Sequence, residues 1–141
     1  MAQNPFVGTW RLLSLEVRRA DGQVSYPWGQ DAVGYIMYSQ DGYMSVAFMC
    51  ANRRRFAAGD ILGGTTEEKV AAAVTFVAYC GRYEILGDRV IHHIEVSFFP
   101  NWTGADQERF YSLDGDKLSL YTPPLLVGGT QGTGYLVWQR V

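Results

Sequence analysis

The chain has 141 residues and a formal net charge of −2, and 48% of its residues are hydrophobic and 14% aromatic. A chain of this size and composition forms one folded domain with a buried core and is not an intrinsically disordered segment. The near-neutral charge lacks the basic surface that nucleic-acid binding requires, and no stretch approaches the ~20 apolar residues of a membrane-spanning helix. We therefore expect a single domain over residues 1–141, with neither nucleic acid nor a membrane as its partner.

The first residues and the cysteines indicate the cellular compartment of the protein. Met1 to Pro5 show no basic segment followed by an apolar one, which is the pattern of a secretory signal peptide. Cys50 and Cys80 are the two cysteines, and their spacing matches neither a disulfide framework nor a zinc site. We expect a cytoplasmic protein with two buried free thiols.

Strands and turns fill the N-terminal half. Phe6 to Val17 predicts a first strand, which ends before the turn pair Asp21-Gly22, and Trp28 lies in a loop that should cover apolar surface. A hairpin around Asp41-Gly42 should join strands over Ala32–Ser39 and Tyr43–Cys50. We expect its inner face to carry Val33, Tyr35, Met37, Met44, Val46 and Phe48, and its other face Gly34, Ile36, Tyr38, Ser45, Ala47 and Met49.

One helix is predicted after this hairpin. Thr65 and Glu68 have the spacing of a capping box, in which a side chain at each position satisfies a backbone N–H of the other. Val70, Ala71, Val74 and Val77 follow at helical spacing. Such a short helix should close one end of a barrel or pack on a sheet.

The segment from Arg82 to Trp102 has the strongest strand pattern. A two-residue loop, Gly87-Asp88, would pair Leu86 with Arg89, Glu84 with Ile91, Arg82 with His93 and Cys80 with Glu95. Alternation then gives a polar face, made of Arg82, Glu84, Arg89, His93 and Glu95. The opposite, apolar face carries Tyr83, Ile85, Val90, His92, Ile94 and Val96, and we expect it to line the interior.

The C-terminal part continues the strand pattern. Gln107–Leu113 and Lys117–Thr122 predict a further hairpin, and Tyr135–Val141 a last strand. Pro123-Pro124 breaks the pattern, and residues 128–134 are expected to be a flexible glycine-rich connection. Together these elements predict an all-β, eight-stranded antiparallel up-and-down barrel with one short helix. The interior of such a barrel holds packed side chains or one small ligand.

Several segments together resemble the lipocalin-like domain family of small bacterial and fungal barrel proteins. They are Asn4–Trp10, Gly34–Ile36, Asp41–Val46, His92–Trp102 and Thr122–Pro124. Gly8-Thr9-Trp10 together with Arg140 looks like the signature of lipocalins and other calycin barrels. The resemblance implies that Trp10 closes one end of the barrel with Arg140 lying across its ring, a cation–π contact. It also implies a barrel that binds small molecules, and some members assist cyclisations in natural-product pathways.

His92 is the sharpest candidate residue, because it should point inward beside Tyr83. An imidazole there can anchor a ligand or exchange a proton, with His92 and Tyr83 as the catalytic pair; alternatively it is a core histidine that bonds Tyr83 or the backbone. Arg109 could bind a ligand carboxylate or phenolate, or pair with a structural carboxylate such as Glu16. The expected ligand-binding residues are Tyr35, Met37, Met44, Val46, Phe48, Tyr83, His92, Ile94, Trp102, Arg109, Tyr111 and Trp138.

Cofactors and metals are not expected. His93 and Glu95 have a spacing that could seat a metal, but Arg82 and Arg89 on the same face oppose a cation. Phosphate-binding and dinucleotide-binding motifs are missing from the sequence.

Three functions remain open. The first is binding of a small hydrophobic or aromatic molecule in the barrel, and the second is a cofactor-independent cyclase or isomerase that uses the same cavity. The third is a filled barrel that serves as a homodimer module through the face of Gly34, Ile36, Ala47 and Met49. The sequence does not decide whether the protein is an enzyme.

Overall fold

The computed structural model describes residues 4–141, which form ten strands, one α-helix and one 3-10 helix. The strands of the first half are β1 (Gly8–Arg18), β2 (Val24–Ser25), β3 (Val33–Tyr38) and β4 (Tyr43–Met49). Helix α1 (Thr66–Val74), β5 (Phe76–Leu86), β6 (Arg89–Ser97) and the 3-10 helix η1 (Pro100–Trp102) follow. The chain ends with β7 (Asp106–Asp114), β8 (Lys117–Tyr121), β9 (Leu125–Val127) and β10 (Thr130–Arg140).

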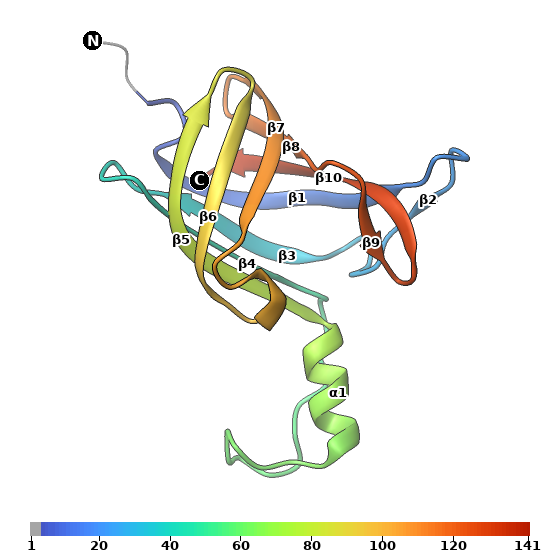
Figure 1. Cartoon of the computed structure of the whole chain (residues 1–141). Coiled ribbons are helices and arrows are strands. Elements are labelled where there is room, and N and C mark those ends of the chain that lie inside the picture. The colour runs from blue at the N-terminus through green and yellow to red at the C-terminus, as the bar shows by residue number, and fades with distance from the viewer. Residues whose placement is uncertain (1–3) are drawn as a thin grey trace.

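The long strands close into a barrel. The antiparallel order is β1-β3-β4-β5-β6-β7-β8-β10, and β10 pairs back onto β1, which leaves the short β2 and β9 as additions at the ends of β1 and β10 (Figure 1). A closed sheet has no exposed edge along its length. The predicted eight-stranded up-and-down barrel is therefore confirmed.

One end of the barrel is sealed by the first and last strands. The guanidinium of Arg140 lies 4.2 Å from the centre of the Trp10 ring, as the family resemblance implies. Arg140 also donates to the carbonyl oxygens of Val7 and Pro5, at 2.9 and 2.8 Å. The indole N–H of Trp10 donates to the carbonyl of Phe6 at 2.9 Å, and both rings are fully buried. These contacts fix the N-terminal segment across this end.

The turn between β3 and β4 corrects the predicted faces of that hairpin. Ser39 donates its N–H to the carbonyl of Tyr43 at 2.7 Å, so three residues, not two, connect the strands, with Gly42 at φ +93. The extra residue turns every side chain of β3 to the other face. Tyr35 and Met37 point outward and are 49% and 48% exposed, so the expectation that they face the interior is wrong. The inward side chains of this hairpin are Ile36, Tyr38, Met44, Val46 and Phe48.

The β5–β6 hairpin follows the predicted register until a bulge interrupts it. Leu86 pairs with Arg89 across Gly87-Asp88 as expected, but Cys80 pairs with Val96 because Glu95 is an extra residue in β6. Val96 therefore faces outward and is 64% exposed, contrary to its predicted inner position. Gly81 lies opposite the bulge, where a Cβ atom would collide with the carbonyl oxygen of His93.

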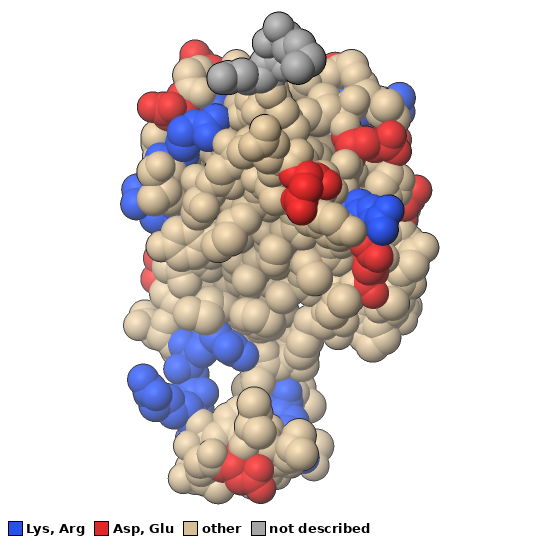
Figure 2. All heavy atoms as spheres, turned by 90° about the vertical axis from the view of Figure 1, so that its left-hand side faces the viewer, with Lys and Arg blue, Asp and Glu red and all other residues tan. Residues whose placement is uncertain are grey.

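Helix α1 and the loop before it form an arm, residues 51–74, that projects from the barrel (Figure 1). The predicted capping box is present, with Thr65 and Glu68 each accepting the other's backbone N–H. The helix buries none of its residues, so it neither plugs the barrel nor covers its sheet as predicted. Figure 2 shows basic side chains gathered where the arm meets the barrel. No helix within residues 4–141 is long and apolar enough to cross a membrane.

Candidate ligand-binding site

The barrel encloses a cavity of about 70 Å³ between its strands. Its wall is mostly aliphatic and aromatic, and the polar groups in it are few. The lining residues on the barrel strands are Leu15, Val17, Ile36, Val46, Phe48, Val77, Tyr79, His92, Arg109, Leu120, Gly134, Leu136 and Trp138, with Thr122 just after β8. Alternation along each strand sends these side chains inward, so the cavity follows directly from the closed sheet.

The cavity opens at the end of the barrel opposite the Trp10–Arg140 contact, where a hairpin and two tryptophans form the mouth. Residues 128–134, predicted to be a flexible connection, instead belong to this hairpin of β9 and β10, which turns at Gly128-Gly129 with φ +62 and +89. The mouth residues Trp28, Val77, Trp102, Leu125 and Val127 also line an outer apolar groove of about 500 Å³, which runs on to α1 and η1. Cavity and groove therefore adjoin at these five residues.

His92 lies in the cavity wall and is 1% exposed. Its Nε2 is 2.7 Å from the Tyr38 hydroxyl and its Nδ1 is 2.8 Å from the Tyr79 hydroxyl. A neutral imidazole has one N–H and one lone pair, so one tyrosine accepts from the ring and the other donates to it. Burial, and then the charge of Arg109, hold the pKa of His92 well below its usual range. The imidazole is thus a neutral, fully bonded group.

Tyr83 takes no part in this network, although its Cα position pairs with that of His92. Its hydroxyl donates to the carbonyl of Ser39 at 2.8 Å and accepts from the side-chain amide of Asn4 at 2.8 Å. The predicted His92–Tyr83 contact is replaced by contacts of His92 with Tyr38 and Tyr79. Tyr83 holds the N-terminal segment and lies outside the cavity wall.

Arg109 is the charged group of the cavity wall. It extends inward from β7 and is 9% exposed. Among residues 4–141 its side chain donates from Nη1 to the carbonyl of Glu108 at 2.9 Å and has no carboxylate within 4.0 Å. It also interacts with the Tyr79 hydroxyl, which partly offsets the rise that burial causes in the pKa of Tyr79. Glu16, the alternative partner, pairs with Arg18 at 3.2 Å instead. The guanidinium therefore presents unused donors to the cavity.

Trp138 adds a second unused donor. The residue is completely buried in the cavity wall, and within the described residues its indole N–H has no hydrogen-bond acceptor. Native proteins leave few buried polar groups unpaired, and the Nε1 of Trp138 is one of these few.

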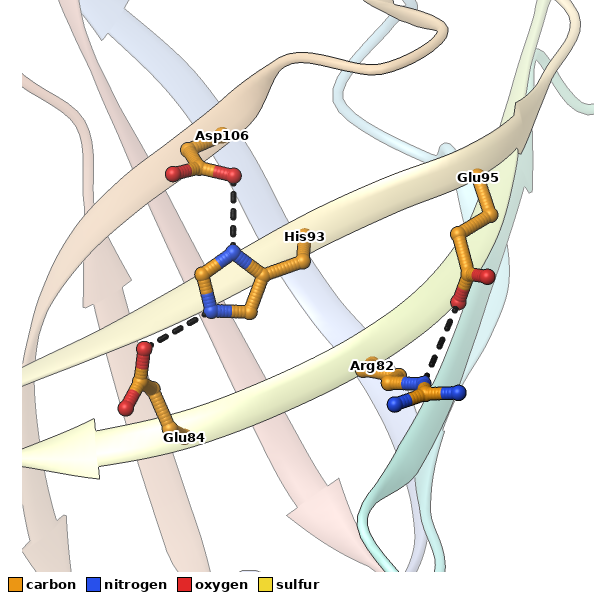
Figure 3. Close-up of polar contacts among 5 residues, drawn as sticks. All are labelled: Arg82, Glu84, His93, Glu95 and Asp106. Atoms are coloured by element: carbon orange, nitrogen blue, oxygen red, sulfur yellow. Dashed lines mark hydrogen bonds and ion pairs between the residues drawn. The ribbon is translucent and has the colours of Figure 1, made fainter.

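The outer face opposite His92 carries a separate polar cluster (Figure 3). His93 bonds Asp106 through Nδ1 at 2.7 Å and Glu84 through Nε2 at 2.8 Å, and Arg82 pairs with Glu95 at 3.8 Å. The hydrogen bonds to Asp106 and Glu84 raise the pKa of His93. Over residues 4–141 no group of three or more His, Cys, Asp or Glu side chains is arranged to hold a metal ion.

The structure divides the predicted ligand-binding residues into three groups. The residues in the cavity wall are Val46, Phe48, His92, Trp102, Arg109 and Trp138. Met44, Tyr83, Ile94 and Tyr111 pack in or against the core outside that wall, and Tyr35 and Met37 are on the outer surface. The wall residues that the sequence reasoning missed include Leu15 and Val17, which the alternation of the first strand could have indicated, and Tyr79, Leu120, Thr122, Leu125, Val127 and Leu136.

A closed antiparallel barrel with an apolar cavity open at one end defines the class of this protein as a small up-and-down β-barrel. The chain belongs to the lipocalin-like domain family, whose model matches residues 7–141. It is 34% identical over 107 residues to the 4'-hydroxy-3'-methoxypropiophenone carrier protein ppsC of Aspergillus oryzae, covering 70% of this chain and 96% of that protein.

One solved structure of low sequence identity shares the fold. A lipocalin-like protein from Bacteroides uniformis superposes with a TM-score of 0.51 at 12% identity, over 98% of this chain and all of that one. A protein from Bacteroides eggerthii gives a TM-score of 0.46 at 16% identity, over 96% and 99% of the two chains.

Proposed function

We propose that this protein binds a small hydrophobic or aromatic molecule in the barrel cavity and its mouth. The observation that carries the proposal is the apolar cavity beside the Tyr79–His92 pair, which adjoins the outer apolar groove through five shared residues. Binding sites for small molecules combine apolar walls with a few placed polar groups. The cavity of about 70 Å³ holds only part of such a molecule, so the rest lies in the groove of about 500 Å³.

The carrier protein of Aspergillus oryzae supports this proposal. Its name denotes a phenolic aryl ketone as the molecule carried. An aromatic ring of that kind matches the tryptophan-lined mouth here, where Trp28 packs edge-to-face on Phe48 at 5.2 Å and Trp102 on Tyr79 at 5.9 Å. As ligand contacts we propose Val46, Phe48, Tyr79, His92, Trp102, Arg109 and Trp138.

A thermal-shift and fluorescence titration with a panel of aryl ketones, phenols and fatty acids tests binding. A ligand at about 100 times its Kd adds roughly 2.7 kcal/mol to the free energy of unfolding, and so raises Tm by several degrees. Val127→Trp should block the mouth and abolish the shift, whereas Val33→Trp, on the outer surface, should preserve it. If no panel member moves Tm, the proposal fails.

A cofactor-independent cyclase or isomerase is the second candidate. The observation in its favour is Tyr79, which lines the cavity and whose hydroxyl bonds the neutral His92 at 2.8 Å, so the protonated phenol could donate a hydrogen bond to a substrate oxygen. In this reading Tyr79, and not Tyr83, contacts the substrate. Tyr79→Phe would then lower kcat for a candidate substrate while changing its Kd less than about threefold; a Kd change alone favours plain binding.

Compartment and partners form the remaining part of the proposal. We propose a cytoplasmic protein without nucleic-acid or membrane partners, supported by the free, half-buried thiols of Cys50 and Cys80.

The face predicted to form a homodimer is wrong, because Ile36 on it is 1% exposed. The outward side chains of Tyr35 and Met37 on β3 are better candidates for a dimer contact. Light scattering of the wild type and of Met37→Glu tests this, and a monomeric wild type refutes it.

A further inference from the structure

The buried guanidinium of Arg109 lacks the partner that its charge calls for. Burial of an arginine is tolerated when a carboxylate and several hydrogen bonds compensate the lost hydration. Within residues 4–141 Arg109 has no carboxylate within 4.0 Å; its guanidinium donates to the carbonyl of Glu108 and interacts with the Tyr79 hydroxyl, both neutral groups that leave its charge unpaired. It lies in the cavity wall, so the missing partner can come from the cavity.

The rest of the cavity wall has the same electrostatic preference. Among the described residues it contains no Asp or Glu side chain, and its other polar side chains are those of Tyr79, His92 and Thr122. His92 is held neutral by burial and by Arg109 itself, as its depressed pKa indicates. A cavity with one cation, spare N–H donors and otherwise apolar walls is complementary to an anionic oxygen.

We propose that the ligand carries a carboxylate or phenolate oxygen that Arg109 binds inside the barrel, while its apolar part passes the mouth and lies in the outer groove. This proposal rests on the proposed binding function. Space supports the orientation, because the inner cavity of about 70 Å³ suits an acidic head group and the groove of about 500 Å³ suits a hydrocarbon or aromatic body. The two spaces adjoin, since five residues line both of them.

Matched anionic and neutral probes test the charge requirement. Calorimetric Kd values are measured for 4-phenylbutyrate against 4-phenylbutan-1-ol, and for decanoate against decan-1-ol, with wild type, Arg109→Met and Arg109→Gln. Arg11→Met is the control, since Arg11 is an exposed arginine on β1. A charge-assisted hydrogen bond predicts that the acids bind wild type at least about tenfold tighter than the alcohols, and that both Arg109 variants remove this difference.

A phenolic probe gives a readout that loss of structure would not produce. Bound 4-nitrophenol should ionise at a lower pH on wild type and on Arg11→Met than on Arg109→Met, as followed by its phenolate absorbance. The proposal is overturned if acid and alcohol bind wild type equally, or if Arg109→Met weakens both alike. If neither acids nor alcohols bind, both the proposed binding function and the anionic-oxygen proposal are wrong. If the alcohols bind as well as the acids, only the anionic-oxygen proposal is wrong.

Discussion

Tyr38 and His92 meet inside the barrel, 2.7 Å apart at the hydroxyl and Nε2, although their strands β3 and β6 are separated by β4 and β5. Tyr79 completes the arrangement at Nδ1, so the ring is bonded on both sides. The three residues form a polar network in a largely apolar interior. Such a network fixes one packing of the core when every member is satisfied, and it is costly when one member is removed.

His92→Phe should strongly destabilise the protein. Phenylalanine fills the space but leaves the hydroxyls of Tyr38 and Tyr79 without their partner, and each buried unpaired group costs about 1–3 kcal/mol. We expect the free energy of unfolding, from urea denaturation, to fall by roughly 2–5 kcal/mol. Tyr79→Phe leaves one buried group, the Nδ1 of His92, without its partner and should cost about 1–3 kcal/mol. A loss below about 1 kcal/mol for His92→Phe would show that the network does not stabilise the core.

His92 should also make stability depend on pH. Its pKa in the folded protein is depressed, first by burial and then by the Arg109 charge, so the unfolded chain binds a proton more readily. Its stabilising contribution is therefore complete above the unfolded pKa near 6.5 and is lost as pH falls below that value. The other groups that face it are the hydroxyls of Tyr38 and Tyr79, whose pKa values are raised by burial and which stay protonated here. Urea midpoints should fall between pH 7.5 and 5.5 in wild type and fall less in His92→Gln; equal slopes would contradict the assignment.

His93, one residue further along β6, should act in the opposite direction. Hydrogen bonds to Asp106 and then to Glu84 raise its pKa, so the protonated form stabilises the fold below the unfolded pKa. This contribution disappears as pH rises through the folded pKa. Because the side chain of His93 is 38% exposed, the effect should stay below about 1 kcal/mol and shrink in salt.

The comparison of wild type with His93→Gln tests this outer cluster. The difference in free energy of unfolding should be largest near pH 5.5 and decline toward pH 8.5. Glu95→Gln, at the neighbouring Arg82 pair, serves as the control without such a decline. A difference that grows with pH would have the wrong sign for a raised pKa.

Much of the fold was predictable because strand alternation is a local property. The β5–β6 turn, the capping box at Thr65 and the inward direction of His92 follow from residue order alone. The face on which each side chain of β3 lies could not be predicted in this way, because one additional loop residue before Tyr43 reverses the alternation. The bulge at Glu95 displaced Val96 in the same way.

The site was predicted less completely because its parts come from distant strands. Tyr38 and Tyr79 are 54 and 13 residues from His92, and nothing in the local sequence links them. The mouth was missed for a different reason. Prolines and glycines at residues 123–129 break regular patterns, yet here they frame the short strand β9, whose Leu125 and Val127 close over the cavity entrance.

The arm should be dispensable for folding of the barrel. Cys50 donates its N–H to the carbonyl of Thr75 at 3.0 Å, so the two ends of the arm are already paired and a short turn can join them. Replacing residues 51–74 by a four-residue Gly-Ser turn removes a helix that buries no residue. We expect cooperative unfolding with a change of less than about 1.5 kcal/mol, and a β-rich circular dichroism spectrum.

The same deletion separates the inner cavity from the outer groove. It removes Ala73 and Val74 from the groove wall but leaves every residue of the cavity wall in place. Binding of a short acid should therefore persist, while a long-chain acid should lose affinity, because its apolar part loses contacts worth about 25 cal/mol per Å² of buried area. The double substitution Ile61→Ser and Leu62→Ser, in the exposed loop of the arm, is the matched control and should leave both affinities unchanged. Equal loss for short and long acids would show that the arm supports the cavity itself.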